Sequence, residues 1–252
     1  MGAGALPQPV ARRQSRRGLG TVNAVAAPQS PVLVVCGMDF EARIAASPDV
    51  ETLYGQRGVM LARALDIRLM QGCAGVISFG VAGGLDATLP PGAVIVASAV
   101  RGGQTSYSTS PYWTAALRRA LPHAESGLLA GSDTPVLTVA DKTALHDAHG
   151  ALAVDMESHI AARAAQTHGI PFAALRVVID PADRAVPPLA FAGMADDGST
   201  DVGAVILGLL KAPHQLGGLL RLGRDASLAR KALAAARSAV GADFAFPALA
   251  AA

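Results

Sequence analysis

The chain alternates apolar strand patterns with helical patterns along most of its length, and this alternation limits the folds open to it. Short runs rich in β-branched residues, bounded by glycine or proline, are typical of strands covered on both faces. The segments between them place apolar side chains at helical spacing, for example Leu61, Leu65 and Leu69. Strands that alternate with helices favour a layered α/β fold with a largely parallel sheet. The expected strands are residues 31–37, 73–80, 93–100, 126–131, 135–140, 150–156 and 171–180.

Helices and loops are expected in the remaining segments. Asp141 is expected to open one helix, and Gly169 to close the next. The glycine-rich residues 81–92 and the polar residues 101–111 are expected to be loops. The expected helices are residues 54–72, 112–121, 141–150, 157–169, 201–212, 215–222 and 225–240, with a helix or turn at 39–46.

One large domain is expected after a basic N-terminal extension. A chain of 252 residues that is 51% hydrophobic can bury one substantial core, which we assign to residues 31–252. Residues 1–30 are rich in Pro, Gly, Arg and Ala, so we expect a disordered extension or a segment outside the mature protein.

The distribution of charge excludes a nucleic-acid-binding body. The net charge is +2, and the extension holds Arg12, Arg13, Arg16 and Arg17 without an acidic residue. The remainder then carries 17 basic and 19 acidic side chains, a net charge of −2. Because a nucleic-acid surface needs a basic footprint, we expect no nucleic-acid partner.

Cysteine, histidine and hydropathy patterns exclude several other classes. Cys36 and Cys73 lie in apolar stretches, which indicates buried reduced thiols rather than a disulfide scaffold. The histidines show no metal-ligand spacing, so we expect no metal and no cofactor. The apolar stretches are too short to span a bilayer and no secretory signal is evident, so a cytoplasmic location is expected.

Acidic residues lie at or just after the ends of three expected strands. They are Glu41, Glu157 and Asp180. In α/β folds ligands bind beyond the carboxyl ends of the strands, so these side chains are expected to face one cleft. Two alternatives stay open: Asp155 could cap the following helix, and Asp180 could only satisfy turn amides.

Four motifs in the same order resemble one enzyme superfamily. Their order along residues 31–185 is similar to that of the purine nucleoside phosphorylases and the methylthioadenosine/S-adenosylhomocysteine nucleosidases. This resemblance implies a three-layer α/β/α sandwich with a mixed, largely parallel central sheet. The motifs are VVCGMDFEA at 34–42, FGVAGGLDATLPPG at 79–92, VDMES at 154–158 and LRVVIDPAD at 175–183.

The resemblance also implies roles for single residues. Asp180 matches the acid that protonates or hydrogen-bonds N7 of the purine. Glu157 matches the glutamate that binds the ribose hydroxyls, and Met156 the neighbour that packs on the sugar. Glu41 matches the glutamate that orients the attacking water, and Val136 lies where the base is clamped.

The nucleophile stays open between water and inorganic phosphate. The glycines around Gly83 allow backbone amides to approach a ligand closely. Val81 stands where relatives carry Ser or Thr, and Glu41 stands where some phosphorylases place an arginine, which favours water. Arg57 could restore a phosphate site or could be a surface arginine, so phosphate remains a possible co-substrate.

The residues after the fourth motif resemble a narrower branch. Residues 180–191 and 202–233 are similar to the hopanoid-associated phosphorylases, to which removal of adenine from adenosylhopane is ascribed. A small-molecule nucleoside or a nucleoside on a lipid is therefore the expected partner. We expect a homo-oligomer, with a peripheral contact at the inner face of a membrane as a further alternative. The rival readings are a phosphate-dependent phosphorylase and a non-catalytic nucleoside-binding protein.

Overall fold

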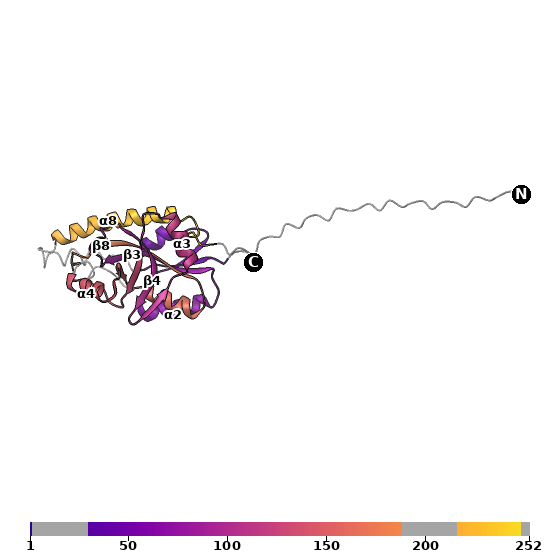
Figure 1. Cartoon of the computed structure of the whole chain (residues 1–252), viewed down its shortest axis with the longest axis horizontal. Coiled ribbons are helices and arrows are strands. Elements are labelled where there is room, and N and C mark those ends of the chain that lie inside the picture. The colour runs from indigo at the N-terminus through magenta and orange to yellow at the C-terminus, as the bar shows by residue number, and fades with distance from the viewer. Residues whose placement is uncertain (2–29, 188–215, 248–252) are drawn as a thin grey trace.

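A central mixed sheet lies between helices on both of its faces (Figure 1). The computed structural model describes residue 1, residues 30–187 and residues 216–247. The N-terminal extension and the expected helix at 201–212 lie outside these residues, apart from residues 1 and 30. The expected sandwich with a mixed, largely parallel sheet is confirmed, since five of its eight strand pairings are parallel.

Eight strands and six helices make up the described part of the chain. The strands are β1 (Val32–Val35), β2 (Val50–Leu53), β3 (Gly75–Gly84), β4 (Val94–Gly102), β5 (Thr105–Ser108), β6 (Glu125–Gly131), β7 (Ala153–Asp155) and β8 (Phe172–Asp180). The helices are α1 (Asp39–Ala45), α2 (Gly58–Leu69), α3 (Pro111–Ala120), α4 (Val139–His149), α5 (Ser158–Thr167) and α8 (Leu216–Ala239).

Part of the sheet closes into a ring. Along the sheet the strand order is β2-β1-β3-β7-β6-β4-β5, and β8 pairs with both β3 and β4. Strands β3, β7, β6, β4 and β8 therefore form a closed circuit of hydrogen-bonded neighbours. Gly83 of β3 is in register with Val154 of β7 on one side and with Asp180 of β8 on the other. The closure thus brings the ends of three strands to one place.

Alternate residues of the central strand β1 pack into two separate cores. Leu33 and Val35 of β1 join the core under α2 and α5. Val32 and Val34, which point the other way, join the core under α1, α3 and α8. Because side chains alternate across a strand, a strand with helices on both faces must be apolar throughout, as β1 is.

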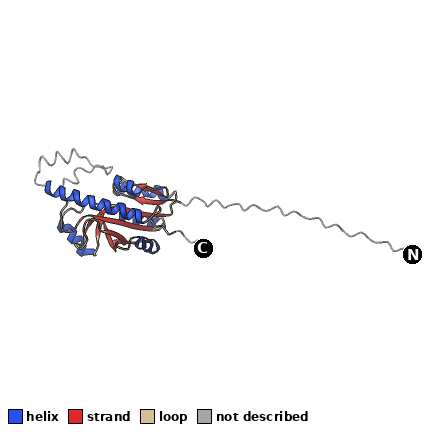
Figure 2. Ribbon diagram, turned by 90° about the horizontal axis from the view of Figure 1, so that it is seen from above, coloured by secondary structure: helices blue, strands red, loops and turns tan. Residues whose placement is uncertain are grey.

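The C-terminal region is one helix where two were expected. Residues 215–222 and 225–240 were predicted as separate helices, but α8 runs unbroken across the intervening Gly223. Figure 2 shows α8 lying along the sheet. Ala229, Leu233 and Ala236 are buried in the core beneath it. This continuous apolar contact outweighs the helix penalty of one glycine, which is about 1 kcal/mol.

The polar segment 101–111 is a hairpin, not a loop. Strand β4 continues to Gly102 and turns at Gly103, where φ is 58°, into the antiparallel strand β5. The sequence did not predict β5 because its serines and threonine are polar and exposed, as an edge strand allows. Strand β2, which was not predicted, is likewise short and only partly buried.

Two further expectations near the ligand-binding end are wrong. The expected glycine loop at 81–92 begins only after Gly84, because β3 extends through its glycines to pair with β7 and β8. Residues 135–140 do not form a strand. Thr138 caps α4 there, with its hydroxyl accepting a hydrogen bond from Asp141 N at 3.1 Å and donating one to Asp141 Oδ2 at 2.7 Å.

Candidate functional site

A cavity of about 250 Å³ lies at the carboxyl ends of β3 and β8, beside β7. It is mostly apolar in its walls, with a few charged groups aimed into it, which is typical of small-molecule sites. The structure brings all the predicted site residues together around it. They are Glu41, Val81, Gly83, Val136, Met156, Glu157 and Asp180.

Glu41 is held by backbone amides on two elements. It is 1% exposed, and its Oε2 accepts hydrogen bonds from Gly37 N at 2.9 Å and Met38 N at 2.8 Å. Its Oε1 accepts from Val81 N at 2.7 Å, so the carboxylate joins α1 to β3. Burial raises the pKa of Glu41, while Arg176 and the three amides oppose that rise.

Two glycines leave room for the carboxylates of the site. A Cβ at Gly80 would lie 2.3 Å from Glu41 Oε1, and one at Gly37 would lie 2.9 Å from Glu157 Oε1. At contacts under 3 Å the neighbouring carboxylate would have to shift, so glycine at both positions lets each carboxylate keep its place. The close approach of backbone to carboxylate fixes where each carboxylate points.

Asp155 and Arg176 form a buried ion pair under the cavity. Arg176 is 0% exposed, and its Nε lies 2.8 Å from Asp155 Oδ2. Asp155 Oδ1 also accepts hydrogen bonds from Glu157 N at 3.0 Å and Ser158 N at 2.7 Å, the first amides of α5. Arg176 Nη2 donates to Ser78 Oγ at 2.6 Å. Asp155 therefore serves the capping role left open above, and joins α5 to the sheet.

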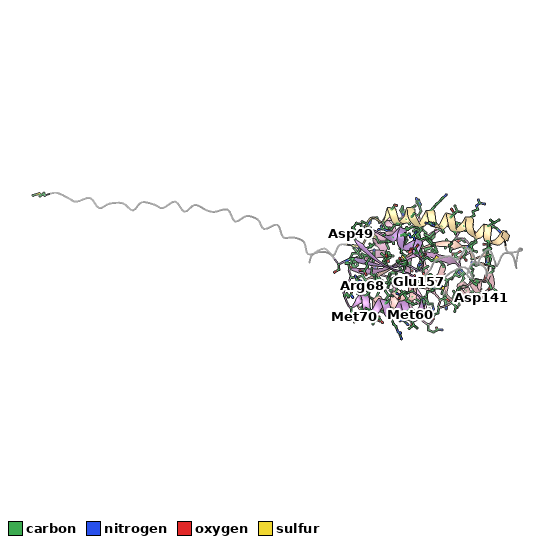
Figure 3. The ribbon with its side chains drawn as sticks, turned by 180° about the vertical axis from the view of Figure 1, so that it is seen from behind. Asp49, Met60, Arg68, Met70, Asp141 and Glu157 are labelled. Carbon is green, nitrogen blue, oxygen red and sulfur yellow. The ribbon has the colours of Figure 1, made fainter. Side chains whose placement is uncertain are left out.

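Glu157 lies at the start of α5 and faces the cavity. Figure 3 shows it within the body of the molecule, away from Met60 and Met70 on the surface. Its Oε2 is 3.6 Å from Arg176 Nη2, too long for a hydrogen bond. Burial raises the pKa of Glu157 to about 7; Arg176 opposes the shift, and the charges of Asp155 and Glu41 add to it. Because Arg176 makes no hydrogen bond to Oε2, this oxygen can accept a hydrogen bond from a ligand hydroxyl.

Asp180, the last residue of β8, also lines the cavity and contacts a buried lysine. Lys142 of α4 is 0% exposed, and its Nζ donates to Asp180 Oδ2. The Asp180 side chain is 13% exposed and also lines a second cavity of about 240 Å³. Burial raises the pKa of Asp180, and Lys142 opposes that rise. Such a carboxyl can hold a proton or accept a hydrogen bond, depending on its ligand.

Lys142 and Arg176 are site residues that the sequence analysis missed. Arg176 had a signal, since it is the one charged residue within the apolar strand Ala173–Val178. Lys142 had none, because the segment around it alternates polar and apolar residues as surface helices do. Arg57, considered above as a surface arginine, is half-buried and lines the cavity.

The described residues offer no obvious place for a metal ion. Among residues 1, 30–187 and 216–247, no cluster of His, Cys, Asp and Glu side chains could hold one. Both cysteines are free thiols, with Cys36 buried and Cys73 half-buried. In that same part of the chain, no helix has the length and hydrophobicity needed to cross a membrane.

Comparisons with known proteins agree on one fold. A family model described as the phosphorylase superfamily matches residues 29–211. The S-adenosylhomocysteine nucleosidase of Streptococcus pyogenes, solved with 5-methylthiotubericidin, is 18% identical with a TM-score of 0.57; 83% of this chain and 98% of that chain are covered. No curated protein sequence matches the chain.

Two further solved structures are similar at the same level. The futalosine hydrolase of Helicobacter pylori is 20% identical with a TM-score of 0.56, over 72% of this chain and 96% of that chain. The 5′-methylthioadenosine/S-adenosylhomocysteine nucleosidase of Neisseria meningitidis, solved with methylthio-immucillin-A, is 17% identical with a TM-score of 0.58, over 82% and 97%. At these identities the likeness establishes the fold.

Proposed function

The chain belongs to the phosphorylase superfamily, and from that premise we propose that it cleaves the N-glycosidic bond of an adenosine-type nucleoside and releases adenine. One observation carries the proposal. A single cavity collects Asp180 from the end of β8, Glu157 from the start of α5 and Glu41 from α1. Nucleosidases with bound nucleoside analogues among the similar structures support the same substrate class.

The chemistry of N-glycosidic cleavage requires groups of this kind. As the C1′–N9 bond breaks, negative charge builds on the base and positive charge on the sugar. In the proposal Asp180 donates a proton or a hydrogen bond to N7, which relieves the first charge. Glu157 binds the ribose hydroxyls, and its carboxylate lies near the second charge. Glu41 orients the water that attacks C1′.

The apolar lining completes the proposed binding mode. Met156 precedes Glu157 and lines the cavity, where it can pack on the sugar. Val136 and Val81 supply apolar walls for the base and the sugar, and Gly83 lies between Val154 and Asp180 without a side chain of its own. Holding the nucleoside in one orientation is worth several orders of magnitude in effective concentration.

A product assay tests the proposal. Adenosine, 5′-methylthioadenosine and S-adenosylhomocysteine are incubated with the full chain, and released adenine is measured by chromatography. Adenine from at least one of them is the expected result. Tight binding of these nucleosides without adenine release would instead support the non-catalytic nucleoside-binding protein.

A phosphate-dependent phosphorylase is the second candidate, and one observation favours it. Arg57 lines the cavity, and its charge lowers the pKa of Glu157, which lines the same cavity. Against phosphate stand the buried carboxylate of Glu41 and the lack of a hydroxyl at Val81. We therefore favour water. Ribose 1-phosphate as the main product, formed only with added phosphate, would establish the phosphorylase.

The proposed substrate extends to a nucleoside on a lipid, as adenosylhopane is. Its support is the sequence resemblance of the C-terminal segment, part of which forms α8 beside the cavity through Leu222 and Ala226. Such a substrate has to be met at a membrane. Helix α8 exposes Leu220 and Leu228 next to Arg221, Arg224 and Lys231, a mixed face that suits an interfacial contact.

Vesicle sedimentation tests the membrane contact. The full chain is expected to sediment with vesicles that contain anionic lipid at low salt and to be released at high salt. Deleting residues 1–30, with their four arginines, is expected to weaken sedimentation while leaving adenine release from soluble adenosine unchanged. Full activity on a lipid-linked nucleoside without any vesicle binding would contradict this part of the proposal.

A further inference from the structure

Lys142 is a fully buried lysine whose surroundings match an ammonium group. Its side chain is 0% exposed. Besides Asp180 Oδ2, its Nζ donates to Pro181 O at 2.8 Å and to Arg184 O at 2.9 Å. These are three acceptors for the three protons of an ammonium group. A neutral amine would turn its lone pair toward one of these oxygens, so the site is built for the charged form.

The same contacts orient the carboxyl of Asp180. Its Oδ2 is engaged by Lys142, and within the described residues no hydrogen bond is donated to Oδ1. The carboxyl lies beside Gly83, where an added Cβ would be 3.4 Å from Oδ2 and 3.5 Å from Oδ1. One oxygen is thus fixed by Lys142, while the carboxyl as a whole stands at the cavity wall.

Asp180 also lies between two cavities. It lines the larger cavity that holds the other carboxylates and the second cavity, which is lined by Asp183, Arg184 and Asp225. A nucleoside in the larger cavity would cover the first side only. The second cavity then leaves a polar approach by which water can return a proton to Asp180.

We propose that Lys142 is a positioning residue for the leaving-group step, which fixes the orientation of the Asp180 carboxyl and stabilises the carboxylate that forms when Asp180 gives up its proton. The inference rests on the proposed function, because it concerns the acid of that reaction. Lys142 lies on α4, outside the four sequence motifs that resemble the superfamily.

The step balances in protons and electrons. The C1′–N9 bond breaks and its electron pair goes to the base, while the proton of the Asp180 carboxyl moves to N7, so adenine leaves neutral. Asp180 is then a carboxylate beside the Lys142 ammonium, which stabilises it. Water adds to C1′ and gives up one proton, and solvent returns one proton to Asp180.

Charged groups from several elements face Asp180. Burial raises its pKa, Lys142 on α4 lowers it most among the charges, Asp225 on α8 raises it, and Arg184 in the turn after β8 lowers it. Removing Lys142 therefore favours the protonated form and moves the pKa of Asp180 upward. The other charged residues around the larger cavity are Glu41, Arg57, Asp155 and Glu157.

The test compares Lys142→Met, Lys142→Arg and wild type by the pH dependence of kcat/KM for adenine release. In wild type the rate is expected to fall at the alkaline side as Asp180 loses its proton. In Lys142→Met this limb is expected to move up by at least about one pH unit. The maximal rate should fall about 10–100-fold for two reasons. Asp180 is then a weaker acid, and the carboxylate that it forms has no ammonium group beside it. Lys142→Arg keeps the charge and should keep the limb near its wild-type position.

Two controls separate a local effect from a general one. Arg119→Met removes an exposed cation of α3, on which no part of the proposed site lies, and should leave the whole pH profile unchanged. The double variant Lys142→Met/Asp180→Asn should be little slower than Asp180→Asn alone, since residues that act as a unit are not additive. An unmoved alkaline limb in a folded Lys142→Met, or full additivity in the double variant, would overturn the inference.

A spectroscopic titration keeps the inference testable if Lys142→Met does not fold. Wild type and Asp180→Asn are labelled at lysine Nζ and at the aspartate carboxyl carbons and titrated by NMR. The Asp180 carboxyl signal should titrate at the pH of the alkaline limb, and the Lys142 Nζ signal should shift between wild type and Asp180→Asn because the two groups are in contact. An Asp180 signal that does not titrate with the limb, or a Lys142 signal unchanged by Asp180→Asn, would overturn the inference. If wild type releases no adenine from any nucleoside, the proposed function fails instead.

Discussion

Two buried ion pairs lie beside the same cavity, and they differ in how much of each carboxylate is left for a ligand. In each, the cation is fully buried, and it reaches the cavity through its carboxylate: Arg176 contacts Asp155, and Lys142 contacts Asp180. The carboxylate of Asp155 is 2% exposed, and its oxygens are bound by Arg176 and by the first amides of α5. The carboxylate of Asp180 is 13% exposed and stands at two cavities.

The difference separates a carboxylate whose acceptor sites are used within the protein from one that is open to a ligand, as the proposed acid Asp180 has to be. Burying a charge is costly in both places, and both are compensated by an opposite charge. Asp155 has its acceptor capacity occupied by the protein, so a ligand could offer it little. Asp180 keeps part of that capacity on the cavity side. The number of acceptor sites left for a ligand, rather than burial or charge, separates the two.

The largest expected effect is on the structural pair. Arg176→Met should lower the free energy of unfolding by about 3–5 kcal/mol, because it leaves Asp155 buried without its cation and removes the nearest positive charge from Glu157 and Glu41. Urea unfolding followed by circular dichroism measures this loss. A variant as stable as wild type would remove the distinction drawn between the two pairs.

The reactive pair should lose activity rather than stability. Asp180→Asn keeps the size of the side chain and an acceptor for Lys142, but it cannot release a proton, so turnover should fall by about 10²–10⁴. Its unfolding free energy should drop less than that of Arg176→Met. Adenine release within a few-fold of wild type would remove Asp180 from the mechanism.

Glu157, which adjoins Asp155 in sequence but faces the cavity, should behave like Asp180. Glu157→Gln weakens hydrogen bonds to the ribose hydroxyls, each worth about 1.5–3 kcal/mol when a charge is involved, so kcat/KM should fall about 10–100-fold. Wild type should also react poorly with 2′-deoxyadenosine. Equal rates on ribo- and deoxynucleosides would contradict the proposed contact.

The same residue should give stability a pH dependence. The pKa of Glu157 is raised from 4.5 to about 7, so the folded state binds more protons than the unfolded state between these values. Stability is therefore present below the lower value and is lost as pH rises through the upper one, by about 1–3 kcal/mol. Urea midpoints from pH 4.5 to 8 should fall in wild type and be flatter in Glu157→Gln.

The smallest effect is expected at an exposed pair. Arg68 and Glu51 meet at 2.6 Å on the surface, and Glu51 is 47% exposed (Figure 3 labels Arg68). Glu51→Gln should change the unfolding free energy by about 0–1 kcal/mol, because water screens such pairs. A larger loss would mean that exposure is a poor guide to the value of an ion pair in this protein.

The sequence predicted the layers and the grouping of the site residues, for a physical reason. Strands covered on both faces must be apolar along their whole length, so β1, β3 and β8 stand out. The carboxyl ends of the parallel strands β1, β3 and β8 meet at one edge, so Glu41 and Asp180 could be placed together before their contacts were seen. Glu157 reaches the same cavity for a reason that the sequence did not predict, because the short strand β7 runs antiparallel to β3 beside Gly83.

What the sequence did not predict depends on contacts between distant residues. Strand β5 is a polar edge strand. It forms through its antiparallel backbone pairing with β4, because its own residues bury little apolar surface. Lys142 is buried only because the turn after β8 folds over it with two carbonyl oxygens, from Pro181 and Arg184. The spacing of apolar residues along the sequence reports neither the closure of the strand ring nor the burial of a lysine.

The fit of Gly80 against Glu41 bears on how a mutational scan of this gene would look. Gly80 does not line the cavity, yet any side chain there would collide with the Glu41 carboxylate and with Arg176 Nη1, 2.7 Å from the added atom. Every substitution at codon 80 should therefore score as severely as loss of Glu41 itself. A map of intolerant positions would therefore include a residue that does not touch the proposed ligand, and comparing alanine with larger residues at this codon would not reveal the difference.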